Sequence, residues 1–175
     1  MKHLGLFRHA KSDWGDRDQR DFDRGLNERG RRGAALMGRH IRNQEPKWDI
    51  VLASPAERVR LTLDAAKLGV ETQFDPRLYL AGTETHFDLV KELAGDADCV
   101  LIAAHNPGLQ DVLLALVSPD EETADFREAM VKFPTASFAV LQLPIDDWAE
   151  LGQSNGKLIH FKRPRDLDET LGPAD

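Results

Sequence analysis

The sequence predicts a three-layer α/β/α sandwich built around a mostly parallel β-sheet. Short apolar runs, typical of buried strands, alternate along the chain with segments in which apolar residues recur at helical spacing. Strands that alternate with helices form right-handed βαβ units, which place a parallel sheet between two layers of helices. At 175 residues the chain has the length of one domain.

Six apolar runs are the expected strands. The fourth, DCVLIAA, is the strongest of them because it is apolar after its first residue, and the third is the weakest. The expected strands span residues 3–8, 49–53, 70–74, 98–104, 137–143 and 157–161.

Four helices are expected between the strands. Asn27 is a favourable N-cap residue for the first of them. Ser54 as N-cap and Pro55 as first helical residue predict the start of the second. Gly30 and Gly33 lower the helix propensity of the first helix and indicate close packing against a neighbouring segment. The four expected helices span residues 27–44, 54–69, 83–93 and 107–116.

We expect one domain over residues 1–162. Residues 11–25 are rich in Asp and Arg and contain two glycines, which is typical of an exposed loop. A polar connection over residues 146–156 separates the last two strands. The charged, proline-containing end of the chain, residues 163–175, is expected to form a flexible tail.

The composition excludes several classes of protein. Apolar residues make up 41% and charged residues 30%, as in soluble globular chains, and the net charge of −7 argues against a nucleic-acid partner. Cys99 is the single cysteine, so neither an intrachain disulfide nor a cysteine-rich zinc site can form. We find no apolar run long enough to span a membrane and no N-terminal signal segment, and therefore expect a cytoplasmic protein, with a monomer as the simplest state.

Charge is distributed unevenly along the chain. Residues 1–62 contain 14 basic and 9 acidic side chains, whereas the remainder is strongly acidic. This asymmetry is compatible either with an anion site in the first third of the chain or with a solvated charged loop.

Basic, hydroxyl and amide side chains follow three of the expected strands at the point where each strand ends. The carboxyl ends of parallel strands meet at one edge of a sheet, so we expect these side chains to share one pocket. The set consists of Arg8, His9, Ser12, Ser54, Arg58, His105 and Asn106.

Two guanidinium groups and two imidazoles in one pocket suit a tetrahedral dianion. Arginine binds phosphoryl oxygens in a bidentate manner, and a neutral imidazole is a competent nucleophile toward phosphorus. A metal site made from His9 and His105 is disfavoured, because Arg8 would repel a cation. The sequence contains no P-loop, dinucleotide fingerprint or nucleophile elbow. The other histidines, interpreted as packing or surface residues, are His3, His40, His86 and His160.

Six segments in order along the chain resemble the histidine phosphatase superfamily, and within it the SixA-like phosphohistidine phosphatase branch. They are LFRHAKS (6–12), LNERG (26–30), LASPAERVRLT (52–62), AHNPGL (104–109), FPTASF (133–138) and GKLIHFKRP (156–164). The resemblance implies the phosphoglycerate mutase-like fold of that superfamily.

The resemblance also implies roles for four residues. His9 matches the nucleophile that becomes phosphorylated, and His105 matches the second histidine that contacts the phosphoryl group. Arg8 and Arg58 match the two phosphate-binding arginines.

Further positions match the family with alternative roles left open. Ser12 and Asn106 are candidates for contact with substrate or phosphate, and equally for a turn or cap. Thr62 matches a helix threonine with a packing role, and Thr135 and Ser137 lie where the family has a small residue near the pocket.

The chain departs from the wider superfamily at two points. Ala10 stands where glycine usually follows the nucleophile, which keeps a small residue there. The general acid expected shortly after the third strand is absent, with Glu84 the nearest, weak candidate, as in the SixA-like branch.

The implied activity is a phosphatase that uses neither metal nor cofactor and works through a phospho-His9 intermediate. Without a built-in acid, it is expected to hydrolyse P–N bonds or esters with good leaving groups, taken from a phosphorylated protein or a small phosphorylated molecule. The alternatives are a phosphomutase or small-molecule phosphoesterase of the same superfamily, and a phosphate-binding module without catalysis.

Overall fold

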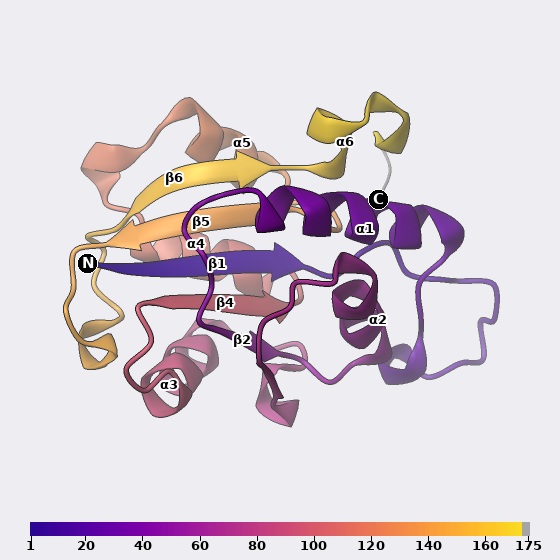
Figure 1. Cartoon of the computed structure of the whole chain (residues 1–175), viewed down its shortest axis with the longest axis horizontal. Helices are drawn as coiled ribbons and strands as arrows, with labels where there is room; N and C mark the ends of the chain where they lie inside the picture. Colours follow the sequence, from indigo (N-terminus) through magenta and orange to yellow (C-terminus); the bar gives the residue numbers. More distant parts are fainter. Residues whose placement is uncertain (173–175) are drawn as a thin grey trace.

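A six-stranded β-sheet with the order β3-β2-β4-β1-β5-β6 forms the centre of the molecule (Figure 1). The structure is a computed structural model and describes residues 1–172. Strands β3, β2, β4 and β1 run parallel, β5 is antiparallel to β1, and β6 is antiparallel to β5. The expected, mostly parallel sheet is therefore confirmed, with one strand reversed. The strands are β1 (Lys2–Arg8), β2 (Ile50–Ala53), β3 (Thr72–Phe74), β4 (Cys99–Ala104), β5 (Phe138–Leu143) and β6 (Lys157–Lys162).

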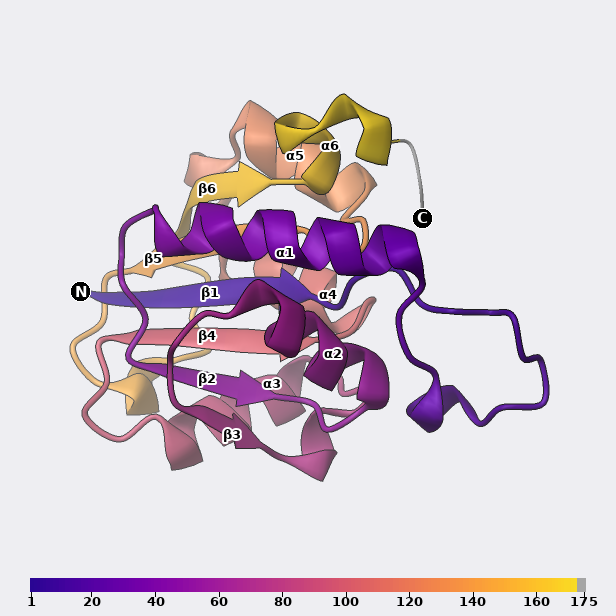
Figure 2. The same cartoon turned by 45° about the vertical axis from the view of Figure 1, so that its right-hand side comes forward.

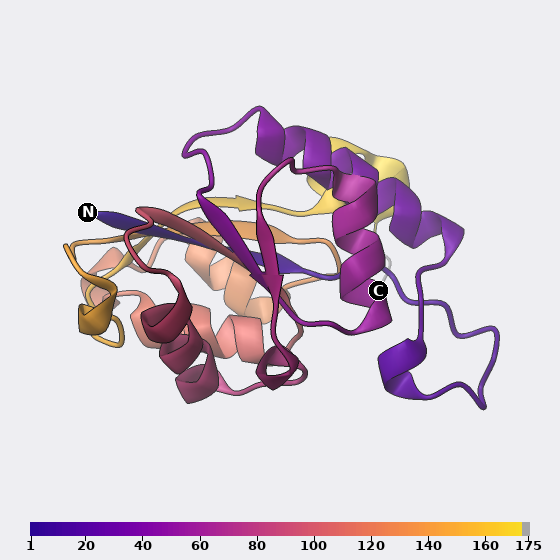
Figure 3. The same ribbon diagram turned by 60° about the horizontal axis from the view of Figure 1, so that its bottom comes forward.

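Helices cover both faces of the sheet, as Figure 3 shows for α1 and α2 on one side and α3 on the other. Successive residues of a strand point to opposite faces, so Leu6 enters the core beneath α3 and α4 while Phe7 enters the core beneath α1 and α2. Both faces are buried, which explains why the strands are continuous apolar runs. The helices are α1 (Glu28–Arg42), α2 (Glu57–Ala66), α3 (Thr83–Leu93), α4 (Gly108–Leu116), α5 (Ala124–Val131) and α6 (Pro164–Leu167).

The starts of the first two helices test the capping predictions. Asn27 caps α1 as expected, because its side-chain oxygen accepts a hydrogen bond of 2.7 Å from the backbone N–H of Gly30. The predicted cap of α2 is wrong: the helix begins at Glu57 with Ala56 as N-cap, and the hydroxyl oxygen of Ser54 accepts a hydrogen bond from the N–H of Ala56 at 3.3 Å. Helix α5 was not expected.

The N-terminal end of α1 is pressed against the segment that follows β1. A Cβ on Gly30 would collide with the carbonyl oxygen of Lys11, which confirms the close packing predicted there. At Gly33 a Cβ would meet only Ala136 and Pro164, at ordinary contact distances.

The end of the chain departs from the flexible tail we expected. Helix α6 and a 3-10 helix at Glu169–Leu171 pack beside α1 (Figure 2), with Pro164 and Leu171 buried. The apolar residues within this charged segment explain the packing. The rest of the expected tail, residues 173–175, lies outside the described residues.

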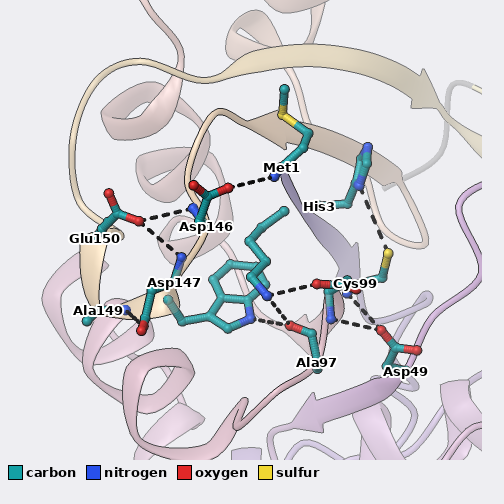
Figure 4. Close-up of polar contacts among 12 residues, drawn as sticks. Met1, His3, Asp49, Ala97, Cys99, Asp146, Asp147, Ala149 and Glu150 are labelled. Carbon is teal, nitrogen blue, oxygen red and sulfur yellow. Dashed lines mark hydrogen bonds and ion pairs between the residues drawn. The ribbon is translucent and has the colours of Figure 1, made fainter.

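Polar contacts fasten the sheet at the amino end of β1, far from the predicted site (Figure 4). Lys2 forms a 2.8 Å ion pair with Asp98, and the carboxylate of Asp49 accepts hydrogen bonds from the backbone N–H groups of Asp98 and Cys99, each at 3.0 Å. Within residues 1–172, none of the helices combines the length and apolar character that a membrane span needs.

At the opposite edge of the sheet, the carboxyl ends of three strands lie side by side and are followed by the predicted site residues. In the sheet register Arg8 of β1 lies beside Ala104 of β4, and Ala53 of β2 lies beside Ala103. The residues that follow these strand ends therefore start from neighbouring positions.

Candidate active site

His9 follows β1 directly and is held by backbone hydrogen bonds on two sides. Its N–H donates to the carbonyl of Ala104 at 3.1 Å, and its carbonyl accepts from the N–H of Ala136 at 2.9 Å. The ring nitrogen Nδ1 lies 2.8 Å from the carbonyl oxygen of Ala10. Because a carbonyl can only accept, Nδ1 carries the ring proton in this contact, and Nε2 keeps its lone pair.

The electrostatic surroundings keep the His9 imidazole neutral. Burial lowers the pKa of His9 well below its ordinary value, and the nearby positive charges of Arg8 and Arg58 lower it further. A neutral ring with an available nitrogen is the form in which histidine acts as a nucleophile.

His105 follows β4 and lies beside His9. The centroids of the two rings are 5.3 Å apart, and the rings are tilted by 56°. The Nε2 atom of His105 lies 2.8 Å from the hydroxyl oxygen of Ser54, the residue we had expected to cap α2. Burial, followed by the charge of Arg58, lowers the pKa of His105 to about 3. The sequence-based expectation that the two histidines meet is confirmed.

The Nδ1 atom of His105 is buried and has no hydrogen-bond partner among the described residues. A buried polar atom without a partner costs free energy, and such atoms in native proteins occur preferentially at functional sites. The cost is tolerated here beside the predicted nucleophile.

Arg58 lies in the first turn of α2 with its guanidinium turned inward, and its side chain is only 6% exposed. It donates to the backbone carbonyl of Asp21 at 2.8 Å and to a carboxylate oxygen of the same residue at 3.0 Å. The hydroxyl of Tyr79 donates to that carboxylate oxygen too. The ring of Tyr79 stands edge-on to His105, with centroids 5.4 Å apart, so these groups form one cluster with the histidines.

Asp21 is ionised in this cluster. Burial would raise its pKa, but the hydrogen bond from Tyr79 and the charge of Arg58 together outweigh burial and lower it. The Tyr79 pKa is raised by burial and by the hydrogen bond to Asp21.

Asp21 reaches the site because the loop over residues 13–25 folds around a buried arginine. The guanidinium of Arg24 donates to the backbone carbonyls of Asp13, Asp16 and Gln19 at 2.9–3.0 Å. It also stacks on the ring of Trp14, 3.9 Å from the ring centroid. This segment, expected only as an exposed loop, extends beyond the sheet edge (Figure 2) and is ordered by Arg24.

Arg8 ends β1, and its Nη1 donates to the carbonyl of Phe133 at 2.9 Å. The side-chain amide of Asn106 donates to the same carbonyl at 3.2 Å and to Gln110 at 2.9 Å. One carbonyl thus holds an arginine from one strand end and an asparagine from another.

Thr62 connects two of the site segments. Its hydroxyl donates to the carbonyl of Arg58 at 2.6 Å and accepts from the N–H of Ala10 at 2.9 Å. This contact fixes α2 against the turn that follows His9. The packing role implied for Thr62 is therefore to position Arg58 and His9 relative to each other.

The remaining predicted residues lie around this centre. Ser12 is buried, and its carbonyl accepts from the Asn27 side chain at 3.3 Å; a contact of Ser12 with substrate stays a prediction. Thr135 lines a cavity beside the nucleophile, and Ser137 is fully buried with its carbonyl accepting from the N–H of Arg8 at 3.0 Å. Glu84 is exposed in the first turn of α3.

Sequence reasoning missed Asp21 and Tyr79. Tyr79 lies shortly after the third strand, where the superfamily has its general acid, but a tyrosine has no carboxyl group. Asp21 is one of several acidic residues in a loop, and nothing in the sequence distinguishes it from its neighbours. Among residues 1–172 no three His, Cys, Asp or Glu side chains are grouped so that they could hold a metal ion.

Comparison with known proteins adds independent evidence. The family model of the histidine phosphatase superfamily (branch 1) matches residues 4–87, which include Arg8, His9 and Arg58. The solved structure of SixA from Nakamurella multipartitia, described as a proposed phosphohistidine phosphatase, is 30% identical, with a TM-score of 0.83 over 93% of this chain and 96% of that one. The chain belongs to the histidine phosphatase superfamily, in its SixA-like branch.

Two further comparisons cover nearly the whole chain. SixA from Agrobacterium tumefaciens, described in the same way, is 28% identical with a TM-score of 0.77, covering 93% of this chain and 99% of that one. The Mycobacterium leprae protein ML1117 is 34% identical over 161 residues, covering 90% of this chain and 99% of its own. This histidine phosphatase is accordingly a hydrolase that removes phosphoryl groups.

Proposed function

We propose that the protein hydrolyses phosphohistidine, or phosphate esters with good leaving groups, through a phospho-His9 intermediate and without a metal ion. The observation that carries the proposal is the pair of neutral imidazoles, 5.3 Å apart, with Arg58 in the same cluster. The substrate is a phosphorylated protein or a small phosphorylated molecule, and we propose that the enzyme works in the cytoplasm.

The first step is an in-line attack of the His9 Nε2 lone pair on phosphorus. The Ala10 carbonyl supports this role, because it holds the proton on Nδ1, away from the attacking atom. As the new N–P bond forms, the bond to the leaving group breaks, and Arg8, Arg58 and His105 offset the charge on the equatorial oxygens. Two guanidinium groups supply the positive charge that a metal ion brings in other phosphotransferases.

The second step is attack of water on phospho-His9, which releases inorganic phosphate and returns the imidazole to its neutral form. The low pKa of His9 favours this step, because a ring that prefers the unprotonated, neutral state accepts the electron pair of the breaking N–P bond.

The nature of the leaving group follows from the acids near the site. An alkoxide needs a proton when it is expelled, whereas a phosphorylated imidazole can take one from solvent near neutral pH, because an ordinary imidazole has a pKa of about 6.5. Asp21 is ionised by its contacts with Tyr79 and Arg58, so it is not a proton donor poised at neutral pH, and Glu84 is exposed on α3. This supports a preference for P–N bonds.

The same observations weigh against the alternatives. A phosphomutase needs a carboxyl group that alternates between acid and base, and the pKa of Asp21 is shifted downward, away from neutral pH. A module that only binds phosphate has no need of a neutral imidazole with an available Nε2, since a cation binds the anion better.

A substrate panel tests the proposal. We expect kcat/KM to be highest for a phosphohistidine peptide, lower for an aryl phosphate and lowest for a sugar phosphate, with His9→Ala inactive on all three. Faster turnover of the sugar phosphate than of the phosphohistidine peptide would contradict the P–N preference. Wild-type protein that binds phosphate but turns over none of the three would indicate a binding module.

A further inference from the structure

Two adjoining hollows lie beside the nucleophile, between the N-terminal end of α1, the end of α5 and the start of α6. Figure 2 shows α5 and α6 above α1. The hollows share the side chains of Lys132, Arg163 and Arg165, so they form one continuous depression. We call it the basic trough, and define it by the cations that line it: Lys11, Arg29, Arg127, Lys132, Arg163 and Arg165.

The basic trough lies beside the backbone that carries the nucleophile. Ala10 and residues 134–136 line its first hollow, and the N–H of Ala136 donates to the carbonyl of His9. The trough and the predicted nucleophile are therefore separated by one layer of backbone. The trough therefore adjoins the nucleophile through the backbone of Ala10 and Ala136.

Cations outnumber carboxylates in the wall of the trough. Glu128, in the second hollow, is the one carboxylate among the described lining residues. Arg163 forms ion pairs with Asp166 at 2.9 Å and with Glu128 at 3.6 Å. Its charge is therefore partly neutralised, and its role in the trough is structural. No described carboxylate forms an ion pair with Arg29 or Arg165; Asp168 interacts with Arg29 only at longer range, where the charge of Arg29 helps to lower the pKa of Asp168. This concentration of cations stands out in a chain with a net charge of −7.

The shape of the trough favours an extended chain over a single small anion. Its cations come from four separate segments and are spread over two hollows, whereas one phosphate group needs donors that converge on a point. Apolar surface lies between them: Pro134, Pro164 and Leu171 line the first hollow, and Val131, 86% exposed, lines the second. A polypeptide with carboxylates and an interspersed apolar side chain matches this pattern.

We infer that the basic trough docks an acidic polypeptide segment of a protein substrate, adjacent to the phosphorylated residue. The inference rests on the proposed function, and it narrows the substrate from any phosphorylated molecule to a phosphorylated protein. Most of its energy is electrostatic, so the preference for acidic flanking residues is expected to weaken as salt rises.

The experiment compares two phosphohistidine peptides, one with Asp and Glu flanking the phosphorylated residue and one with Asn and Gln in their place. We expect the wild-type enzyme to prefer the acidic peptide about tenfold in kcat/KM at low salt, as several exposed ion pairs together provide. The preference should fall toward unity in the double variant Arg29→Gln/Arg165→Gln. Because the ratio is taken within each enzyme, a general change in activity cancels.

The matched control is Lys91→Gln, which removes an exposed cation from α3, outside the trough. We expect it to keep the tenfold preference. An equal rate on both peptides in the wild type, or a preference that the double variant keeps, would overturn the inference and leave the proposed function intact. A salt titration of the wild-type preference supplies the same test if the double variant does not fold.

Binding of the acidic peptide without a phosphoryl group, measured by fluorescence anisotropy, separates the two proposals. If neither phosphopeptide is hydrolysed but the acidic peptide still binds in a manner that needs Arg29 and Arg165, the proposed function fails and the docking surface stands. If a small bisphosphorylated molecule competes for Arg29 and Arg165 while the acidic peptide does not bind, the trough is an anion subsite and the inference is wrong.

Discussion

Asp21 occupies the guanidinium group of Arg58 that a substrate phosphate would bind. Both terminal nitrogens of the Arg58 guanidinium already donate to Asp21, at 2.8 and 3.0 Å. If Arg58 binds the phosphoryl group, phosphate must displace this carboxylate or share the guanidinium with it. We therefore predict that Asp21→Asn binds inorganic phosphate more tightly than the wild type does.

The magnitude follows from the exposure of the pair. The side chain of Arg58 is 6% exposed and that of Asp21 is 48% exposed, so water screens the pair from one side. An ion pair of this kind contributes about 1 kcal/mol, the upper end for exposed pairs. Removing the competing charge should therefore lower the dissociation constant of phosphate about fivefold. The side-chain amide introduced by this substitution can still accept the hydrogen bond from Tyr79, so the loop is expected to stay in place.

The assay is competitive inhibition by phosphate of aryl phosphate hydrolysis, at low and at high salt. The matched control is Asp23→Asn, which removes a carboxylate from the same loop, where it pairs with the exposed Arg20 at 2.7 Å. We expect this control to change the inhibition constant less than about twofold. Phosphate binding that weakens in Asp21→Asn would refute the reasoning, because Asp21 would then be orienting Arg58 for the ligand.

Three further predictions concern stability and cofactor need. Because the folded-state pKa of His105 is about 3, the unfolded chain binds the extra proton below pH 6.5, and His105 alone should lower stability by about 1.4 kcal/mol per pH unit between pH 6 and 4. The lowered pKa of His9 adds to the fall in the same direction, so urea titrations should show a shallower fall in His105→Asn than in the wild type. Thr62→Val leaves the N–H of Ala10 without its acceptor and should lower the free energy of unfolding by about 1–3 kcal/mol, whereas Thr72→Val, at a partly exposed site, should change it little. Treatment with EDTA should leave turnover unchanged, and activity that is lost and then restored by added metal would contradict the mechanism.

The layered fold and the meeting of the strand ends could be predicted because they depend on local pattern. Apolar runs buried on both faces give strands whatever their partners are, and parallel strands that cross over a helix must end at the same edge. His9, Arg58 and His105 were brought together by this rule alone. The reversed strand β5 follows from its connection through α5, a short helix with little periodicity in its sequence.

The parts that escaped prediction depend on contacts between distant residues. In isolation Ser54 is a favourable helix cap, but its hydroxyl binds His105, 51 positions away. Asp21 reaches Arg58 because Arg24 donates hydrogen bonds to three backbone carbonyls and so fixes the fold of the loop. A count of charges in the sequence cannot show that arrangement. The end of the chain packs beside α1 with Pro164 and Leu171 buried, two apolar residues within a charged segment.

Trapping the phosphorylated enzyme tests the central claim most directly. The protein is mixed rapidly with a phosphohistidine peptide, quenched in base to preserve the acid-labile N–P bond, and mapped by mass spectrometry. We predict one phosphoryl group on His9 in the wild type and none in His9→Ala. A phosphoryl group found on another residue, or full turnover by His9→Ala, would contradict the account.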